Sequence, residues 1–513
     1  MKNINLASNL FHIFKKMQMT DLVVCAGARN APLLSALENT DFLIESYFEE
    51  RSSGFYALGK SKNANRPVAI ITTSGTAAAE LLPAVIEAHY QNIPLIVITA
   101  DRPKSYRGTG SPQAIEQVGI FGSYVESTAD WDVHTVDFSI HFSGHKPIHI
   151  NICFDEPLST DQMLPVPSIS AQIVNQQKTN ISDQKIIIRN PIAIISELQK
   201  NDRVFIKNFL LKNQIVHYAE FLSGLRNDPE LLPLQILNSE QTLKKIFTEQ
   251  KSESIVRMGG IPTLRFWRDL EFGFNHIHVY SFSHTEFSGL CRRNELYAFR
   301  QLQGVEIIKT SVFDLISDQD IQSQKLKLIS ELKNSEQNYI FQLSEIIGNQ
   351  SLYVGNSLPI RMWDAFTTQP QFMQSVYANR GANGIDGQIS TYLGWSEKMI
   401  ESWCLIGDLT ALYDLASLGL SNFSECKRRI VVMNNSGGQI FNRLFGNKKY
   451  LNSQKVDFKS WAGLWHWDYI EISDSADFNK LEFIKSDHII IELKPDNAQT
   501  ELFWQKWDTI CKK

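Results

Sequence analysis

The chain has 513 residues, of which 43% are hydrophobic and 20% are charged, and its formal net charge is −5. This length is too great for one ordinary core and predicts two to four domains. The slightly acidic balance excludes the basic surface typical of nucleic-acid-binding proteins, and the lack of an uncharged apolar run of about 18 residues argues against a membrane span.

The N-terminal residues predict an amphipathic helix. Lys15 and Lys16 stand where a signal peptide would need an apolar run, so residues 1–19 are not expected to be a targeting segment. The six cysteines are scattered and form no CxxC pair, which argues against a disulfide framework or a zinc site. We therefore expect a soluble enzyme of the reducing cytoplasm.

Short apolar runs alternate with helix-length segments along most of the chain. The runs that predict buried strands are residues 68–73, 95–99, 148–154, 277–282, 352–354, 403–406, 430–433 and 489–493. Between them, residues 77–90 and 412–420 have helical patterns. The alternation predicts an α/β fold with mostly parallel sheets.

Two changes in composition predict domain boundaries. Residues 165–184 are rich in Ser, Gln, Asn and Pro, which is typical of a linker, and residues 322–344 form a polar, helical stretch. We therefore predict three α/β domains, at 1–170, 186–325 and 335–513.

A pair of acidic residues follows a short predicted strand near the N-terminus. Glu49 and Glu50 lead into a helix of small residues that includes Gly54 and Gly59. First-turn acids commonly complement the helix dipole, and composition does not exclude that role here.

The most informative chemical pattern is in the C-terminal third. Asp408 and Asn435 each follow a predicted strand and are 27 positions apart, enough for a helix and a return strand. Two adjacent parallel strand ends would present a carboxylate beside an amide oxygen, and nearby glycines such as Gly437 would allow close approach of a phosphate. Either segment alone is most often an ordinary turn. The ordered pair predicts a magnesium site beside a phosphate-binding loop.

This pair resembles the motif of thiamine-diphosphate enzymes, a Gly-Asp followed by Asn-Asn. The resemblance implies that Asp408, Asn435 and the carbonyl of Gly437 hold Mg²⁺ or Mn²⁺. It also implies that Glu50, rather than Glu49, is the catalytic acid that activates the aminopyrimidine ring. The cofactor of this family lies between domains of two subunits, so at least a homodimer, or a dimer of dimers, is expected.

Further segments resemble one family within this class, 2-succinyl-5-enolpyruvyl-6-hydroxy-3-cyclohexene-1-carboxylate synthase of menaquinone biosynthesis. They are residues 73–77, 82–88, 98–103, 113–115, 355–361, 379–387 and 437–441. The implied fold has pyrimidine, central and diphosphate domains. The implied cofactor-binding residues are Thr73, Ser74, Gly75, Ile385, Gly407, Asp408, Leu409, Asn435, Gly437, Gly438, Gln439, Ile440 and Phe441.

The same resemblance implies two substrates. In that family 2-oxoglutarate is decarboxylated and the remaining succinyl-semialdehyde unit is added to isochorismate. Ser357, Arg361 and Arg380 are expected to bind the distal carboxylate of 2-oxoglutarate, which suits the planar guanidinium fork. The residues expected to bind isochorismate are Arg29, Arg102, Gln113 and Arg265.

Two positions depart from the family pattern. The family's Gly-Ser-Arg is here Gly27-Ala28-Arg29, and its Lys-Arg pair is Leu264-Arg265. Each missing charge-assisted hydrogen bond is worth roughly 1.5–3 kcal/mol, although Arg268 could replace the lost cation. A related enzyme with another acceptor and a catalytically silent binding subunit therefore stay open as alternatives.

Overall fold

The structure is a computed structural model. It describes residues 2–38, 40–158, 173–174, 185–249, 251–292, 295–309, 313, 315–368, 375–442 and 448–511. Two compact units form: unit 1 contains Met1–Thr179, Asn379–Ile400 and Tyr413–Cys426, and unit 2 contains Asn180–Ala378, Glu401–Leu412 and Lys427–Lys513. Among the described helices, none combines the length and the hydrophobicity that a membrane crossing requires.

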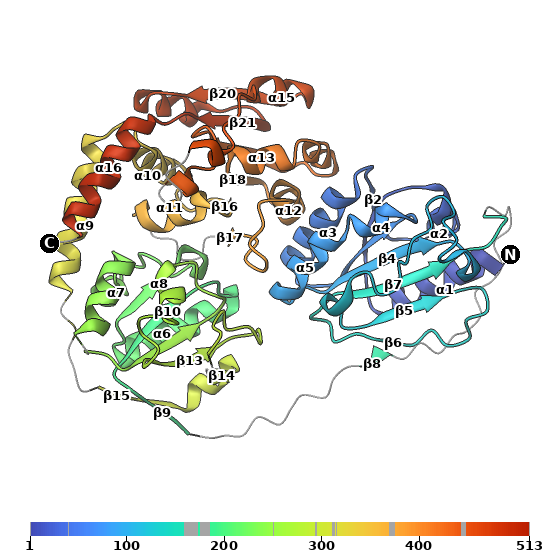
Figure 1. Ribbon diagram of the computed structural model, residues 1–513, viewed down its shortest axis with the longest axis horizontal. Helices are drawn as coiled ribbons and strands as arrows, with labels where there is room; N and C mark the ends of the chain where they lie inside the picture. Colours follow the sequence, from blue (N-terminus) through green and yellow to red (C-terminus); the bar gives the residue numbers. More distant parts are fainter. Residues whose placement is uncertain are drawn as a thin grey trace. The chain divides into compact units, whose positions relative to one another are not determined.

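A six-stranded parallel sheet forms the centre of unit 1 (Figure 1). Its strands, in spatial order, are β2 (Leu43–Ser46), β1 (Asp21–Val24), β3 (Val68–Thr72), β4 (Leu95–Asp101), β7 (Ile148–Cys153) and β5 (Thr128–Trp131). The helices of this part are α1 (Lys2–Lys16), α2 (Ala31–Leu37), α3 (Glu50–Ala64), α4 (Thr76–Ala79) and α5 (Leu82–Gln91). Strands β3 and β4 are buried along their whole length, which explains their continuous apolar sequences. A short pair, β6 (Ile140–His141) and β8 (Ile173–Val174), lies outside this sheet.

Helix α12 (Gln388–Trp395) belongs to unit 1 because it packs tightly on α3. A Cβ atom at Gly59 would lie 2.1 Å from the carbonyl oxygen of Thr391, and one at Gly394 would lie 2.1 Å from that of Tyr56. The two helix backbones therefore touch where each has a glycine. The 3-10 segment Ser417–Phe423 also contacts α12.

Unit 2 contains a five-stranded parallel sheet near its N-terminal end (Figure 1). The strands, in spatial order, are β11 (His217–Ala219), β10 (Pro191–Ile195), β12 (Ser254–Met258), β13 (His278–Phe282) and β14 (Glu295–Tyr297). The accompanying helices are α6 (Lys200–Asn213), α7 (Ser239–Thr248) and α8 (Arg265–Asp269). A separate pair joins β9 (Ile186–Arg189) to β15 (Val305–Ile308). Apolar residues from both sides of the larger sheet form two core clusters.

A second six-stranded parallel sheet completes unit 2. Its order is β17 (Val376–Tyr377), β16 (Ser351–Val354), β18 (Glu401–Gly407), β19 (Lys427–Met433), β21 (His488–Leu493) and β20 (Asp468–Ile472). The helices are α9 (Ile316–Glu331), α10 (Glu336–Ile347), α11 (Leu358–Phe366), α13 (Asp408–Tyr413), α15 (Phe458–Leu464) and α16 (Asn497–Ile510), of which α9 and α16 lie side by side (Figure 1). Strands β18 and β19 pair in parallel, so their carboxyl ends lie next to each other.

The predicted α/β class with parallel sheets is confirmed, and every predicted strand is present. The helix expected over residues 77–90 is instead two helices, because Pro83 fits only the first turn of α5. The single helix expected over 412–420 is interrupted: α13 ends at Tyr413, residues 414–416 form a turn, and a 3-10 helix runs from Ser417 to Phe423. The predicted linker lies outside the described residues, apart from β8. The domain boundaries 1–170, 186–325 and 335–513 stay a prediction.

Candidate active site

The loops that follow the parallel strands of unit 1 carry most of the predicted N-terminal site residues. Arg29 follows β1, Glu50 follows β2, Thr73 to Gly75 follow β3, and Arg102 follows β4. Because the strands are parallel, these loops lie at one edge of the sheet, where open α/β sheets bind ligands.

The two adjacent glutamates differ in their surroundings. Glu49 is the N-cap of α3, and its carboxylate accepts a hydrogen bond from the Ser52 amide at 3.0 Å. The half-buried carboxyl group of Glu50 makes no hydrogen bond to another residue of the described chain. Burial raises the pKa of Glu50, and the negative charges of Glu49 and Glu80 raise it further. Of the two carboxyl groups, that of Glu50 is therefore the one with a raised pKa and no hydrogen bond to another described residue.

The loop of Thr73, Ser74 and Gly75 packs closely against its neighbours. A Cβ atom at Gly27 would lie 2.6 Å from that of Thr73, so only glycine fits there. The Gly75 amide, in a left-handed conformation at φ +86°, donates to the buried Gln117 side chain at 2.8 Å. A Cβ at Gly75 would lie 3.2 Å from the Cα of Gln113, which places Gln113 beside this loop.

Two of the three arginines predicted for the acceptor, Arg29 and Arg102, already have partners within unit 1. The Arg29 guanidinium is buried, donates to the Phe154 carbonyl at 3.2 Å and lies 3.3 Å from a Glu156 carboxylate oxygen. Arg102 Nε donates to the Pro112 carbonyl at 2.8 Å. A guanidinium has five N–H donors, so both keep donors for an anion.

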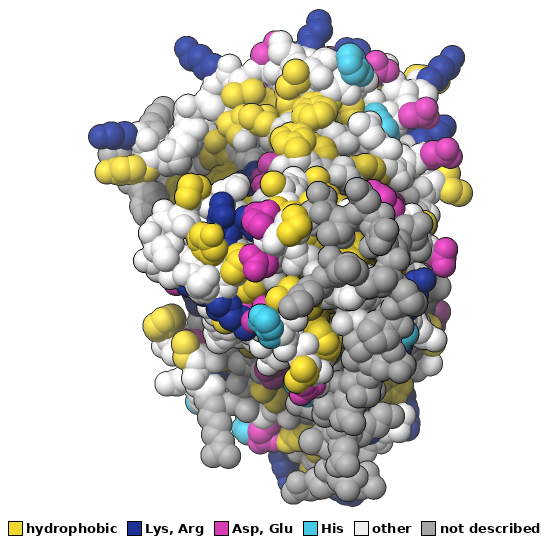
Figure 2. Space-filling view, turned by 90° about the vertical axis from the view of Figure 1, so that its right-hand side faces the viewer, with side chains coloured by type: hydrophobic (Ala, Val, Ile, Leu, Met, Phe, Trp, Pro, Cys, Tyr) yellow, Lys and Arg dark blue, Asp and Glu magenta, His cyan; other side chains and the backbone are white. Residues whose placement is uncertain are grey.

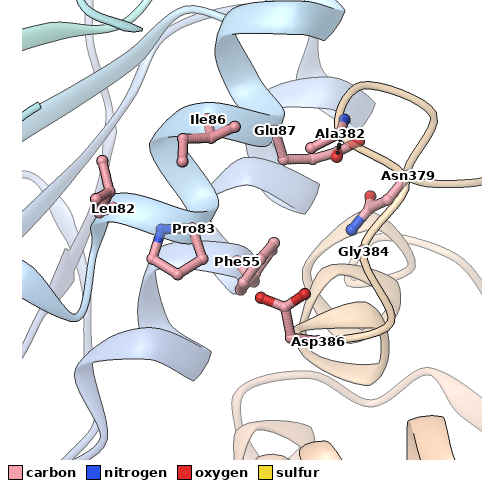
Figure 3. A pocket seen from close by; sticks show the side chains of 9 residues that line it. All are labelled: Phe55, Leu82, Pro83, Ile86, Glu87, Asn379, Ala382, Gly384 and Asp386. Atoms are coloured by element: carbon pink, nitrogen blue, oxygen red, sulfur yellow. Dashed lines mark hydrogen bonds between the residues drawn. The ribbon is translucent and has the colours of Figure 1, made fainter. Parts of the chain in front are cut away.

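Arg380 and Ile385 lie in the segment that precedes α12, beside a cavity of about 240 Å³. Figure 3 shows that side chains of α3 and α5 face this segment across the cavity. The residues that line the cavity are Phe55, Leu82, Pro83, Ile86, Glu87, Asn379, Ala382, Gly384 and Asp386. Neither Arg380 nor Ile385 is among them, although Arg380 acts electrostatically on Glu87.

Unit 2 brings Arg361 and Arg265 together. Arg361 follows the strained N-cap Ser357 of α11, at φ 70° and ψ −123°, and it interacts electrostatically with Glu240, Arg268 and Arg265. The Arg265 amide donates to the Glu240 carboxylate at 2.8 Å. Such a cluster of exposed guanidinium groups can bind a carboxylate ligand. Arg268 belongs to this cluster, and its replacement of the missing lysine stays a prediction.

The predicted metal ligands gather at the carboxyl ends of β18 and β19. Asp408 is buried, and its carboxylate accepts from the Gly437 amide at 2.7 Å and from Leu409 at 2.8 Å. The side-chain amide of Asn435 donates to Glu336 at 3.2 Å, so its oxygen is the atom left to bind a cation.

The rest of the predicted diphosphate loop lies close by. Gly407 ends β18, and Gly437 has φ +114°, which favours glycine. The Gly438 amide donates to the Leu451 carbonyl at 2.5 Å. Gln439, Ile440 and Phe441 form one 3-10 turn, and the Gln439 side chain donates to the Asn435 carbonyl at 3.0 Å.

Sequence reasoning missed two side chains that contact the predicted metal ligands. Glu336, fully buried on α10, touches Asn435, and Gln454 donates to the Asp408 carboxylate at 3.0 Å. Burial raises the pKa of Glu336 to about 7, and the charge of Asp408 contributes to this rise. Two buried carboxylates, paired with no Lys or Arg in any described contact, fit a bound cation. Within the described residues no three His, Cys, Asp or Glu side chains form a metal site, so the ligand set would mix carboxylate, amide and carbonyl oxygens, as magnesium accepts.

Comparisons of the sequence with known proteins relate the chain to thiamine pyrophosphate enzymes. A profile described as the N-terminal TPP binding domain of thiamine pyrophosphate enzymes matches residues 4–120. A 2-succinyl-5-enolpyruvyl-6-hydroxy-3-cyclohexene-1-carboxylate synthase of Bdellovibrio bacteriovorus is 40% identical, with 100% of both chains covered. Relatives of the same name come from Akkermansia muciniphila, 34% identical over 93% of this chain and 94% of the relative, and from Lysinibacillus sphaericus, 28% identical over 93% of each.

Proposed function

Because the chain belongs to the family of 2-succinyl-5-enolpyruvyl-6-hydroxy-3-cyclohexene-1-carboxylate synthases, we propose that it joins a unit derived from 2-oxoglutarate to isochorismate. It is a thiamine-diphosphate-dependent enzyme that forms a carbon–carbon bond. In the proposed reaction, a step of menaquinone biosynthesis, 2-oxoglutarate loses carbon dioxide. The remaining succinyl-semialdehyde unit then bonds to isochorismate.

The observation that carries this proposal is the state of Glu50. Its carboxyl group has a raised pKa and makes no hydrogen bond to another described residue, while Glu49 beside it caps the helix. Glu50 can thus hold a proton against a nitrogen of the aminopyrimidine ring. When bound, thiamine diphosphate supplies the carbon nucleophile that attacks the keto group of the donor.

We propose that Asp408, Asn435 and the Gly437 carbonyl hold Mg²⁺ or Mn²⁺. The buried charge of Asp408 and the orientation of the Asn435 amide towards Glu336 support this assignment. The Gly407, Leu409 and Gly438 backbone would line the diphosphate, together with Gln439, Ile440 and Phe441. On the ring side, Thr73, Ser74, Gly75 and Ile385 would contact the cofactor.

Ser357, Arg361 and Arg380 are the proposed ligands of the distal carboxylate of 2-oxoglutarate. A guanidinium binds a carboxylate through two parallel hydrogen bonds, which gives directional recognition as well as charge. The cations around Arg361 support this assignment, since they create a positive region within unit 2.

Isochorismate carries two carboxylates, and Arg29, Arg102, Gln113 and Arg265 are its proposed ligands. Ala28 offers no hydroxyl, but Arg268 near Arg361 supplies a cation in place of the one missing at Leu264. A second candidate function is addition of the same succinyl-semialdehyde unit to a different acceptor. The departures at Ala28 and Leu264 from the family's serine and lysine favour it.

We also propose that the chain forms a homodimer, or a dimer of dimers, in the cytoplasm. The edge strand β2 exposes Leu43 at 56% and Ile44 at 43%, and the following Phe48 is 68% exposed. Exposed apolar edge strands are uncommon on monomers. Figure 2 shows several hydrophobic side chains close together near the top of the face that is drawn.

The proposal is tested by following 2-oxoglutarate with the purified protein, thiamine diphosphate and Mg²⁺, with and without isochorismate, by mass spectrometry. The expected product is isochorismate that carries the four-carbon succinyl-semialdehyde unit, formed only with the cofactor and lost with EDTA. Decarboxylation without that adduct would point to another acceptor. Failure to consume 2-oxoglutarate would contradict the proposed donor.

A further inference from the structure

We propose that Glu87 is a positioning residue that, together with Asp414, fixes the segment carrying Arg380 and Ile385 so that the enzyme can recognise the distal carboxylate of its donor. This inference rests on the proposed function, because it takes Arg380 to be a ligand of that carboxylate. Neither Glu87 nor Asp414 is itself expected to touch a substrate.

Glu87 holds the beginning of the segment. Its side chain on α5 is 3% exposed, and its two carboxylate oxygens accept hydrogen bonds from the amides of Gly381 and Ala382, each at 2.7 Å. Gln91 donates to the same carboxylate. Figure 3 shows the bond to Ala382 at the wall of the cavity.

The backbone of the segment lies directly on α5 at this point. A Cβ atom at Gly381 would lie 2.6 Å from the Glu87 carbonyl oxygen and 3.1 Å from its carboxyl carbon. Only glycine can approach so closely, and the approach lets two successive amides reach one carboxylate. A buried carboxylate that accepts several N–H bonds is held firmly, because leaving any of these groups unpaired would be costly.

Asp414 holds the end of the same segment. It is fully buried and accepts from the amides of Gly387 at 3.0 Å, Ile389 at 2.9 Å and Ser390 at 3.2 Å, at the start of α12. Its carboxylate lies 3.7 Å from the guanidinium of Arg51, the residue after Glu50. The end of the segment is thereby tied to the helix that carries the proposed catalytic acid.

The two carboxylates bracket the proposed site residues. Arg380 directly precedes the first anchored amide, and Ile385 lies between the anchors at Ala382 and Gly387. A guanidinium recognises a carboxylate only when its stem starts from a fixed point, and an error of about 1 Å in placing a group can cost roughly a hundred-fold in rate. We therefore assign Glu87 to donor selectivity, in addition to its contribution to packing.

The test compares kcat/KM for decarboxylation of 2-oxoglutarate and of 2-oxopentanoate, which has the same chain length but no distal carboxylate. Glu87→Gln keeps the size of the side chain but turns an N–H₂ group towards a backbone N–H. We expect the preference for 2-oxoglutarate to fall by roughly ten- to a hundred-fold, as it should in Arg380→Ala. Glu38→Gln removes the same charge from an exposed site on α2 and should leave the preference unchanged.

A second variant covers the case in which Glu87→Gln does not fold. Gly381→Ala leaves the carboxylate in place but forces the segment away from α5, and it should lower the same preference. Hydrogen exchange of peptides that cover residues 379–387 should become faster in both variants, relative to Glu38→Gln.

The outcomes separate the inference from the proposed function. If Arg380→Ala loses the preference while Glu87→Gln and Gly381→Ala keep it, the positioning role is wrong and the donor site stands. If Arg380→Ala also keeps the preference, Arg380 does not bind the distal carboxylate of the donor. That result would overturn both the assignment of Arg380 and the positioning role of Glu87. Loss of preference with unchanged exchange in this segment would likewise refute the anchoring.

Discussion

At the scale of single residues, the structure distinguishes two neighbouring glutamates that the sequence alone does not distinguish by role. Glu49 and Glu50 are both acids at a helix start, and either could complement the dipole. The Glu49 carboxylate is occupied by the Ser52 amide, whereas Glu50 is half-buried between charges that raise its pKa. The environment of each side chain, rather than its type, decides which one can act as an acid.

Glu50→Gln should lower kcat by about 10²–10⁴-fold, because an amide cannot exchange a proton with the ring. The fold and the proposed metal site should be intact, so the thermal shift produced by thiamine diphosphate and Mg²⁺ should persist. Glu49→Gln serves as the matched control and should keep most of the turnover. Equal losses in both variants would contradict the assignment of the acid to Glu50.

Lys325 gives a pH-dependent prediction at the same scale. Its ammonium group is buried on α9, 5.6 Å from the ring of Trp507, and donates to the Ala365 carbonyl at 2.9 Å. Burial lowers the pKa of Lys325 from 10.5 to about 7, and the charge of Arg226 adds to this effect. Below pH 7 the folded chain therefore bears the full cost of a buried charge. Between about pH 7 and 10.5, Lys325 is charged in the unfolded chain but neutral in the folded chain. The free-energy cost of burying this side chain therefore falls as the pH rises.

Lys325→Met should consequently raise the midpoint of thermal unfolding by a few degrees at pH 6. The gain should shrink steadily as the pH rises from about 7 towards 10.5, as measured by thermal melts over this range. A gain that is the same at every pH would show that the lysine is not buried in its charged form.

At the scale of elements, close contact between α3 and α12 depends on two glycines. Backbone carbonyls occupy the places where Cβ atoms of Gly59 and Gly394 would stand. The contact holds α12 against the helix that begins at Glu50, and it positions the start of α12 where Asp414 binds its amides.

Gly59→Ala should destabilise the protein by about 1–3 kcal/mol or more, although alanine is the better helix former, because the added methyl meets the Thr391 carbonyl at 2.1 Å. Denaturant unfolding measures the change. Gly463→Ala in α15, where no atom lies within 4 Å of the added group, is the control and should be neutral or stabilising by up to about 1 kcal/mol. Similar behaviour of the two variants would contradict the tight helix contact.

At the scale of the whole molecule, the proposed dimer would place each cofactor between two subunits. Two chains of 58.5 kDa would then form the smallest active assembly. Glu50 of one subunit would act with Asp408 of another, which makes the assembly testable without a structure of the dimer.

Inactive Glu50→Gln and Asp408→Asn proteins, unfolded together and refolded, should recover up to about a quarter of the wild-type activity. Half of the random dimers are mixed, and each mixed dimer would contain one intact site. Each variant refolded alone is the control and should stay inactive. No recovery, with mixed dimers verified by mass spectrometry, would place each site within a single chain.

The amino-acid sequence by itself determined the α/β class, the buried strands, the acid–amide pair at Asp408 and Asn435, and the family. These features are local: a buried parallel strand needs a continuous apolar run, and a ligand loop needs particular residues directly after it. The sequence predicted one helix over 412–420, where the structure has the end of α13, a turn and a 3-10 helix.

Only the tertiary structure decided which distant groups meet. Glu87 and Gly381 are 294 positions apart, and Glu336 and Asn435 are 99 apart, yet each pair is in direct contact. No periodicity or motif encodes such a pair, because the partner of a buried polar group is set by how the chain packs around it. The sequence thus predicted which residues could do the chemistry, and the packing decided which carboxylates contact the backbone around them.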